Sequence, residues 1–159
     1  MGSGATSGGI RFRDNHNSTI RGYIYYNNSN EIGFLNSAGN WSLKCDNSGN
    51  VTATGNVTAY SDARLKTNVN TINDALSIVG KLRGVSFDWK ESGEHSIGVI
   101  AQEVEKVLPE LVLTQQVLDP TGEREVKSVD YGKIVGVLIN AINELKEEVE
   151  ELKNAKITG

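Results

Sequence analysis

Up to Tyr60 the chain carries short runs in which apolar and polar side chains alternate. There are four such runs, and they cover residues 10–13, 20–26, 31–35 and 41–45. Alternation with a period of two is typical of a strand with one buried face. The runs are separated by clusters rich in Asn, Gly and Ser, which favour tight turns. The pattern therefore predicts short strands joined by tight turns.

A six-residue repeat follows these runs. Residues 49–54 read GNVTAT and residues 55–60 read GNVTAY. One such unit has too little apolar surface to form a core by itself, so it needs stacked neighbours or other chains. The repeat favours the end of a β-fibre. The alternative is a pair of ordinary hairpin strands with similar turns.

Beyond the repeat the pattern becomes a mixture of helix and strand signals. Apolar side chains at helical spacing predict a helix over residues 72–79. Asn70 or Thr71 can cap its start, and Gly80 or Gly84 can end it. The other expected elements are a strand over 85–90, a helix over 101–108 closed by Pro109, and a hairpin of 111–118 and 124–129 around the turn 119–122.

The last predicted helix has a heptad pattern. Its apolar side chains recur in alternating steps of four and three: Tyr131, Val135, Leu138, Ile142, Leu145, Val149 and Leu152. From Asn143 to Asn154 the helix is polar everywhere except on this stripe, so the stripe needs a partner. The pattern predicts self-association as a coiled coil, and the alternative is a surface helix packed on its own domain. Val and Ile at position a with Leu at d favour two strands.

Charge is distributed unevenly along the chain. Residues 1–61 carry four basic and three acidic side chains, whereas residues 62–159 carry 12 basic and 17 acidic ones. This change coincides with the change of pattern, so we divide the chain into a β-fibre end over residues 1–61 and a mixed α and β domain over residues 62–159. The fold class is α+β. The net charge of −4 disfavours a nucleic-acid partner, because binding to phosphates needs clustered Lys and Arg.

Composition also disfavours metals and membranes. Cys45 is the single cysteine, and with His16 and His95 it offers too few ligands, too widely spaced, for a zinc site. No apolar stretch approaches the ~18 residues of a membrane span. We therefore expect no metal, no cofactor and no membrane partner. Trp41 and Trp89 are expected to be buried packing residues.

Ser61 and Lys66 stand where the two patterns meet. A lysine can act as general base for a serine only when it is neutral, and burial or nearby positive charge must lower its pKa from ~10.4 for that. Arg64 is a candidate source of such charge. A serine five residues before a lysine is common, so this spacing alone does not indicate catalysis.

Three blocks of the chain, taken in order, resemble a known family. They are residues 61–68 (SDARLKTN), 97–112 (IGVIAQEVEKVLPELV) and 129–131 (VDY), the last followed by the leucine-rich helix. They are similar to the intramolecular chaperone domain at the C-terminus of phage tailspikes, tail fibres and endosialidases, also called peptidase family S74. The resemblance covers about residues 58–155, and three ordered blocks are far more specific than any one of them.

The resemblance implies a self-cleaving chaperone. Ser61 and Lys66 match the serine and lysine of the family's dyad, and the cut is expected next to Ser61, between Ser61 and Asp62. The family domain assembles as a homotrimer, here through a helix over residues 130–155, although the heptad chemistry itself favours a dimer. It registers a triple β-helix or similar fibre stalk, here the part before Ser61, and is then released.

The position of the cut raises a geometric question. Attack by Ser61 on the carbonyl of Tyr60 passes through a five-membered ring, whereas attack on its own carbonyl needs a strained four-membered ring. Cleavage after Ser61 therefore requires an unusual local backbone, a water nucleophile or the serine of a neighbouring chain. The residues leave these three routes open.

Other polar residues are candidates for supporting roles. His95 can hydrogen-bond near the cleavage site, and Gln102, Glu103 and Glu105 can position the scissile loop. For each of them the alternative is a side chain that is simply solvated. Asp62 is expected to shape the cleavage turn.

Two other functions fit parts of the pattern. One is a non-catalytic trimeric adhesin tip that stays attached and binds a receptor, with Ser61 and Lys66 inert. The other is a membrane-tethered transcription factor with the same module, which the fibre-like segment and the lack of a basic DNA-binding region oppose. The resemblance places the chaperone in the host cytoplasm during phage assembly and the fibre part, its folding client in the same chain, in the virion tail.

Overall fold

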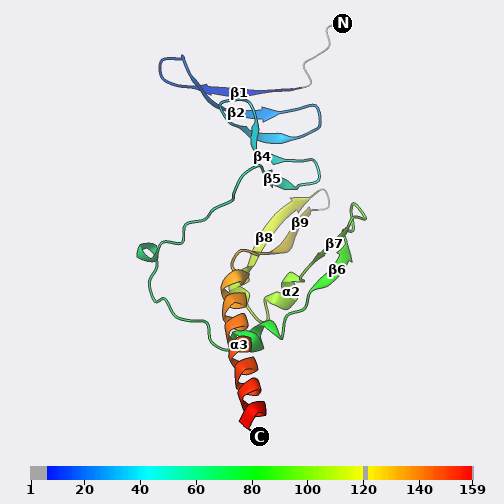
Figure 1. The fold of residues 1–159 in the computed structure, drawn as a ribbon. Helices are drawn as coiled ribbons and strands as arrows, with labels where there is room; N and C mark the ends of the chain where they lie inside the picture. The colour runs from blue at the N-terminus through cyan, green and yellow to red at the C-terminus, as the bar shows by residue number, and fades with distance from the viewer. Residues whose placement is uncertain (1–6, 120–121, 159) are drawn as a thin grey trace. The chain divides into compact units, whose positions relative to one another are not determined.

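The structure is a computed structural model, and it describes residues 7–119 and 122–158. The chain divides into two compact units, residues 1–67 and 68–159 (Figure 1). The first contains strands, and the second combines strands with helices and ends in a long helix. The expected mixture of strands and helices is therefore confirmed, as is the C-terminal helix.

The first unit contains one antiparallel sheet of five strands, in which each strand pairs with the next along the chain. The strands are β1 (Gly8–Arg13), β2 (Ile20–Tyr26), β3 (Ile32–Leu35), β4 (Trp41–Cys45) and β5 (Val51–Ala53). The first four coincide closely with the four alternating runs, so that prediction is confirmed. Figure 1 shows this meander in blue and cyan.

Asn and Asp side chains close the turns between these strands. Asn36 Oδ1 accepts hydrogen bonds from the backbone N–H groups of Ala38 and Asn40, both at 3.0 Å. Asn27 and Asp46 accept equivalent pairs of bonds in their own turns. Each turn also contains a residue with a left-handed backbone: Asn17, Asn30, Gly39 or Gly49. These local requirements explain the abundance of Asn and Gly between the runs.

One face of the sheet is apolar across all five strands. Strand pairing aligns two rows of side chains on it, Ile10, Ile24, Phe34, Leu43 and Ala53 in one row and Tyr26, Ile32, Cys45 and Val51 in the other. We call these nine side chains the apolar sheet face. Ile10, Phe34 and Val51 remain more than half exposed. The apolar sheet face is therefore open to solvent over much of its area.

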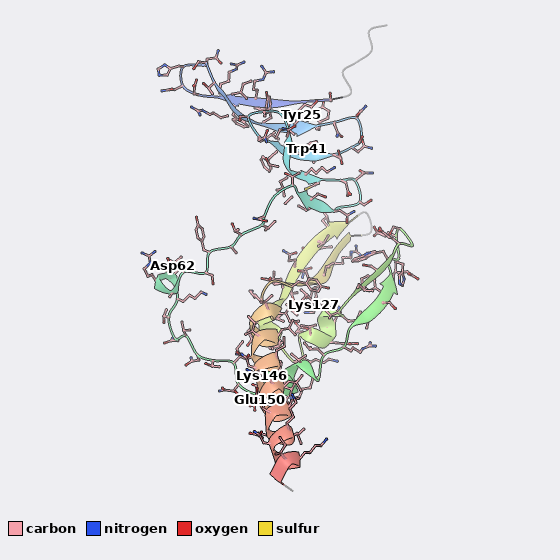
Figure 2. The ribbon with its side chains drawn as sticks, in the orientation of Figure 1. Tyr25, Trp41, Asp62, Lys127, Lys146 and Glu150 are labelled. Carbon is pink, nitrogen blue, oxygen red and sulfur yellow. The ribbon has the colours of Figure 1, made fainter. Side chains whose placement is uncertain are left out.

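The opposite face of the sheet is more polar. Tyr25 packs edge-on against Trp41 with the ring centroids 6.0 Å apart (Figure 2). Lys44 forms an ion pair with Glu31, and the hydrogen bond from Lys44 is the main cause of a lowered pKa for Glu31. Trp41 is half-buried in this contact. Aromatic and charged contacts thus stabilise this face within the chain.

Only the first copy of the six-residue repeat contributes a strand. Val51–Ala53 is β5, whereas residues 55–60 form no strand within the described part of the chain. Val57 and Tyr60 are almost fully exposed. The β-fibre interpretation of the repeat stays a prediction.

The second unit combines two hairpins with short helices and one long helix. Its elements are α1 (Ala75–Val79), β6 (Val85–Asp88), β7 (His95–Gly98), α2 (Ala101–Val104), the 3₁₀ helix η2 (Pro109–Leu111), β8 (Val112–Asp119), β9 (Gly122–Val129) and α3 (Ile134–Thr158). β6 pairs with β7, and β8 with β9, both antiparallel. The predicted hairpin is confirmed, while residues 120–121 of its predicted turn lie outside the described residues.

The start of α1 differs from its prediction. The helix begins at Ala75, and the residue before it, Asp74, has a left-handed backbone with φ 54° and forms no side-chain cap. The carboxylate of Glu144 on α3 caps the helix instead, because it accepts hydrogen bonds from the first two N–H groups. Asn70 and Thr71, the predicted caps, lie too early in the chain for this start.

The ends of the two short helices follow from Gly and Pro. Gly80 ends α1, as predicted. α2 is shorter than predicted, ending at Val104, although hydrogen-bonded turns continue to Leu108. Leu108 has φ −140°, outside the helical region, as expected for a residue before proline. Pro109 therefore begins η2 and does not directly close α2.

The apolar core of the second unit lies between α1 and α3. It consists of buried Ala75, Val137 and Ala141, with Leu76, Ile78, Val79 and Leu108 packed against them. Val104 on α2 and Leu111 in η2 are also buried. The small alanine side chains allow the two helix backbones to approach closely. The core is small for a unit of this length.

Helix α3 has two different apolar faces. Val137 and Ala141 pack against α1 and are each only 4% exposed. The heptad stripe lies on another face and stays 39–65% exposed: Val135, Leu138, Ile142, Leu145, Val149 and Leu152. We call these six side chains the α3 seam. Contacts of α3 with its own unit therefore leave the α3 seam uncovered.

Two aromatic residues differ from their predictions. Tyr131 lies before α3 begins and so is not part of the helical stripe, and its hydroxyl approaches Gly98. Trp89 is 57% exposed and packs edge-on against Phe87 with centroids 5.2 Å apart, so its expected burial is wrong for the single chain. A hairpin of two strands has too little area to bury a tryptophan on its own.

Replacing Val137 by Ala should destabilise the second unit. The change removes two methyl groups between α1 and α3, and the lost contacts and cavity cost about 2 kcal/mol of unfolding free energy. Urea unfolding of the full chain measures this cost. The matched control is Val69→Ala, since Val69 is mostly exposed and its loss should cost less than about 0.5 kcal/mol. Equal costs for the two variants would contradict the described core.

Gly33→Ala should disrupt the sheet. A Cβ at this position would overlap Leu43 O and lie 2.7 Å from Lys44 Cα, so β3 and β4 would have to separate. We expect a loss of about 2 kcal/mol or more. At Gly39 an added Cβ meets open space, so Gly39→Ala costs only the strain of its left-handed backbone, about 1 kcal/mol. Thermal melts followed by circular dichroism compare the two, and equal losses would argue against the close approach.

Candidate cleavage site

A single 3₁₀ turn brings Ser61 and Lys66 together. The turn, η1 (Ala63–Leu65), is closed by two backbone hydrogen bonds of 3.1 Å, and Lys66 then returns to an extended backbone. Lys66 Nζ lies 2.8 Å from Ser61 Oγ. This distance is within the range expected for a nucleophile and its base. The turn folds the chain back between Ser61 and Lys66, so two residues that are five positions apart come into direct contact.

Asp62 caps this turn. Its Oδ1 accepts a hydrogen bond from Arg64 N at 2.9 Å, and the Arg64 guanidinium binds both carboxylate oxygens. The side-chain hydrogen bond from Arg64, and then the backbone one, lower the pKa of Asp62. Figure 2 labels Asp62 at the turn. The charge of Arg64 is therefore balanced by Asp62, which removes the support for its predicted action on Lys66.

The Ser61–Lys66 pair is exposed to solvent in the single chain. In the observed arrangement the Lys66 ammonium donates to the serine oxygen. To act as a base, the lysine must first lose its proton and then accept one from the hydroxyl, and a dry environment favours the neutral amine. The single chain thus places the two side chains as in a dyad, but it does not remove them from water.

His95 begins β7 in the second unit. Its Nδ1 lies 2.8 Å from Asp88 Oδ1 across the β6–β7 hairpin, and both side chains are exposed. The structure thus gives His95 a partner within its own hairpin. Its role near the cleavage site stays a prediction.

Glu103 of α2 and Glu105, the residue that follows α2, are both engaged within the second unit. Glu103 binds the Arg83 guanidinium through both oxygens at 2.7 and 2.8 Å, and this hydrogen bonding lowers the pKa of Glu103. Glu105 accepts a hydrogen bond from Lys127 at 2.9 Å. Gln102 is exposed. Their roles at the scissile loop stay predictions.

Lys127 on β9 was missed by the sequence analysis. Its Nζ donates to Glu105 Oε1 and to Thr114 Oγ1, both at 2.9 Å, and its side chain is only 19% exposed. The hydrogen bond to Glu105 is the main cause of a raised pKa for Lys127. Lys127, labelled in Figure 2, thus fastens the β8–β9 hairpin to α2. The sequence could have indicated this role of Lys127 only through the register of the hairpin, which pairs Lys127 with Thr114.

Within residues 7–119 and 122–158, no group of three or more His, Cys, Asp or Glu side chains is placed to hold a metal ion. In the same ranges no helix combines the length and the apolar character needed to cross a membrane.

Comparison with known proteins places this turn at the edge of a family match. Residues 61–113 match the peptidase S74 family, described as the chaperone of endosialidase. The match begins at Ser61 and includes Lys66 and α2. The geometry of the pair therefore lies inside the matched segment.

The chain is also similar to long tail fibre proteins of phages. The long tail fibre protein Gp37 of Salmonella phage S16 is 32% identical over 109 residues, that of Enterobacteria phage K3 is 35% identical over 104, and that of Enterobacteria phage M1 is 34% identical over 105. These alignments cover 59%, 62% and 62% of this chain. They cover only 14%, 8% and 40% of the three relatives, so the chain spans less than half of their length.

The family match and the fibre relatives agree with the resemblance found in the three sequence blocks. Residues 61–113 therefore match the chaperone-of-endosialidase family, and the chain is similar to phage long tail fibre proteins.

Proposed function

We propose that this chain is a self-cleaving intramolecular chaperone of a phage tail fibre. In this proposal the domain after Ser61 brings three chains together, registers the fibre part before Ser61, and is then released by a cut next to Ser61. The observation that carries the proposal is the 2.8 Å contact between Lys66 Nζ and Ser61 Oγ at the start of the matched segment.

The proposed cleavage is an acyl transfer with Lys66 as the base. The neutral amine takes the proton from Ser61 Oγ, and the oxygen attacks a peptide carbonyl carbon. The C–N bond then breaks, the amine of the following residue leaves with the proton that Lys66 returns, and an ester to the serine remains. One water hydrolyses the ester and restores the serine hydroxyl.

The nucleophile decides which bond breaks: the serine of the same chain, the serine of a neighbouring chain, or water. Ser61 acting on the carbonyl of Tyr60 in its own chain would leave a fragment of residues 61–159. The serine of a neighbouring chain, or a water activated by Lys66, can attack the Ser61 carbonyl and leave residues 62–159. We propose the cut between Ser61 and Asp62, following the family resemblance. The mass of the released fragment distinguishes the two.

The α3 seam supports assembly of several chains. Its six apolar side chains stay exposed after α3 has packed on α1, and full burial of one such side chain stabilises by about 1.5–3 kcal/mol. Charged side chains occupy other positions of the helix, among them Lys146 and Glu150, whose charged groups lie 3.9 Å apart (Figure 2). A partner for the helix therefore gains most by covering the seam.

Two arguments favour three chains over two. The family domain that this chain resembles is a homotrimer, and the apolar sheet face provides a second surface that needs cover. Three sheets arranged around one axis can bury their apolar faces against each other. The seam alone, with Val and Ile at a and Leu at d, would favour a dimer.

Assembly through α3 explains how the domain would act as a chaperone. Once the helices associate, the fibre parts are held at a high effective concentration, so the entropic cost of aligning them falls. Neighbouring chains can also exclude water from the Ser61–Lys66 pair, which favours the neutral amine. Cleavage then removes the domain and leaves the fibre kinetically trapped in its folded form.

A non-catalytic trimeric adhesin tip is the second candidate function. It is favoured by the exposure of Ser61 and Lys66 in the single chain, since catalytic lysines are normally desolvated. In that case the domain stays attached and binds a receptor. In the first candidate function, the domain acts in the host cytoplasm during assembly, and the fibre part belongs to the virion tail, as the names of the relatives suggest.

The purified chain should convert with time into two fragments, one with the mass of residues 62–159. Ser61→Ala removes the nucleophile and Lys66→Ala removes the base, so each should slow the cut at least about 100-fold. Lys66→Arg keeps the positive charge but cannot become neutral, so it should be equally inactive. Intact-mass spectrometry follows the fragments.

Lys81→Ala is the matched control for this experiment, because Lys81 is an exposed lysine outside the turn, and it should cleave at the wild-type rate. A wild-type chain that stays full length, or a Lys66→Arg chain that cleaves normally, contradicts the dyad. The first of these results would favour the adhesin tip.

A charge in the α3 seam should prevent assembly. Leu145→Asp would place a carboxylate from each chain in the apolar seam, so the species of three 17.2 kDa chains should disappear. Native mass spectrometry of this variant in a Ser61→Ala background measures assembly without losses by cleavage. Asn143→Asp introduces the same charge at an exposed polar position and should leave the three-chain species intact. A wild-type dimer or monomer would contradict the proposed trimer.

A further inference from the structure

We propose that Asn140 and Glu144 are positioning residues for the cleavage. They hold the segment that follows the Ser61–Lys66 pair on the helix that carries the α3 seam, so that association of α3 fixes the chain from which Lys66 projects. This inference rests on the proposed function and adds the residues that couple assembly to cleavage.

The two side chains hold residues 72–76 at three points. Glu144 Oε1 accepts a hydrogen bond from Ala75 N at 2.9 Å, and Glu144 Oε2 accepts one from Leu76 N at 2.7 Å. Asn140 Nδ2 donates to Ile72 O at 3.1 Å. All three bonds join α3 to backbone atoms 68 or 69 residues earlier in the chain. We call this set of contacts the α3 anchor.

The α3 anchor supplies a cap that the local sequence does not provide. The first N–H groups of a helix have no partner within the helix, and leaving them buried and unpaired is costly. Asp74, in the usual capping position, has φ 54° and ψ 29° and makes no such bond. Ala75 is completely buried, so water cannot replace the missing cap. A carboxylate that binds both N–H groups meets this need with charge-assisted bonds.

One helix thus carries both the anchor and the surface for association. Asn140 and Glu144 are four residues apart and therefore share a face of α3, next to buried Val137 and Ala141. The α3 seam occupies another face of the same helix. Side chains on two faces of a rigid helix move together, so fixing the seam in an assembly also fixes residues 72–76.

The connection from the anchor to the dyad is short. Only residues 67–71 separate Lys66 from Ile72, and such a span reaches at most about 20 Å. Asn68 shortens it further, because its backbone is left-handed at φ 53° and its carbonyl accepts a hydrogen bond from Asn70 Nδ2 at 2.9 Å. The anchor therefore limits where Lys66 can lie once α3 is assembled.

Glu144→Gln tests the anchor in the full chain. The amide keeps one acceptor but places N–H groups against a second N–H, so the bidentate cap is lost. We expect the cut to slow at least about tenfold while the three-chain species persists, and the amides of Ala75 and Leu76 to exchange hydrogen faster. Glu147→Gln is the matched control, because it makes the same change at an exposed position of α3 and should cleave normally. Asn140→Ala, which breaks only the bond to Ile72 O, should give a smaller defect.

An insertion between the anchor and Lys66 distinguishes a role of Glu144 in positioning Lys66 from a role in stability alone. Gly-Ser-Gly placed between Asn70 and Thr71 lengthens the connection to Lys66 and should itself slow the cut. If the anchor acts through this connection, Glu144→Gln adds almost nothing to the insertion, whereas two independent defects would multiply. Multiplying defects would overturn the positioning role.

The remaining outcomes also decide the question. A wild-type chain that cleaves, with Glu144→Gln cleaving equally fast, contradicts the anchor and leaves the proposed function intact. A Glu144→Gln chain that no longer assembles makes Glu144 an assembly residue and overturns its positioning role. A wild-type chain that never cleaves contradicts the proposed function, and it also contradicts the proposed coupling of assembly to cleavage.

Discussion

The organisation of this chain depends on one constraint, which is that it cannot cover its own apolar side chains. Among the described residues, the buried apolar side chains are few and mostly small: Ala75, Val104, Leu111, Val137 and Ala141. The exposed ones are numerous, and eleven of them form two regular arrays, five on the apolar sheet face and six in the α3 seam. Isolated exposed apolar residues are ordinary, but arrays of this kind mark interfaces. Association of chains is thus the step from which the proposed folding and cleavage follow.

The same constraint accounts for the state of the candidate dyad. The turn at Ala63–Leu65 sets Lys66 Nζ 2.8 Å from Ser61 Oγ by local hydrogen bonds alone, yet both side chains remain in water. The single chain forms the contact between the two side chains, but only neighbouring chains can exclude water from them. The pair would therefore stay inactive until the chains assemble. The α3 anchor holds residues 72–76 on the associating helix, and only residues 67–71 separate this segment from Lys66. Burial of the α3 seam would then come first, and both chaperone action and cleavage would follow from it.

Local patterns in the sequence predicted the elements that depend on local physics. The alternating runs gave the first four strands, because each needs only its own period and turn residues such as Asn36. The heptad stripe identified the exposed face of α3. The sequence did not reveal Glu144 as the cap of α1, because that contact spans 69 residues and no local signal marks it. Tyr131 was misplaced because it continues the heptad period although α3 begins only at Ile134. Trp89 was expected to be buried because it is a large aromatic residue, but the single chain leaves it 57% exposed.

The dependence of the cleavage rate on chain concentration tests the central claim most directly. The full chain is refolded from denaturant over a wide range of concentrations, and the fraction cut next to Ser61 is followed by intact mass. If assembly must precede the cut, the initial rate per chain rises steeply with concentration and levels off once three-chain species dominate. A cut that proceeds at the same rate at every dilution would show that the single chain suffices, and would contradict the account.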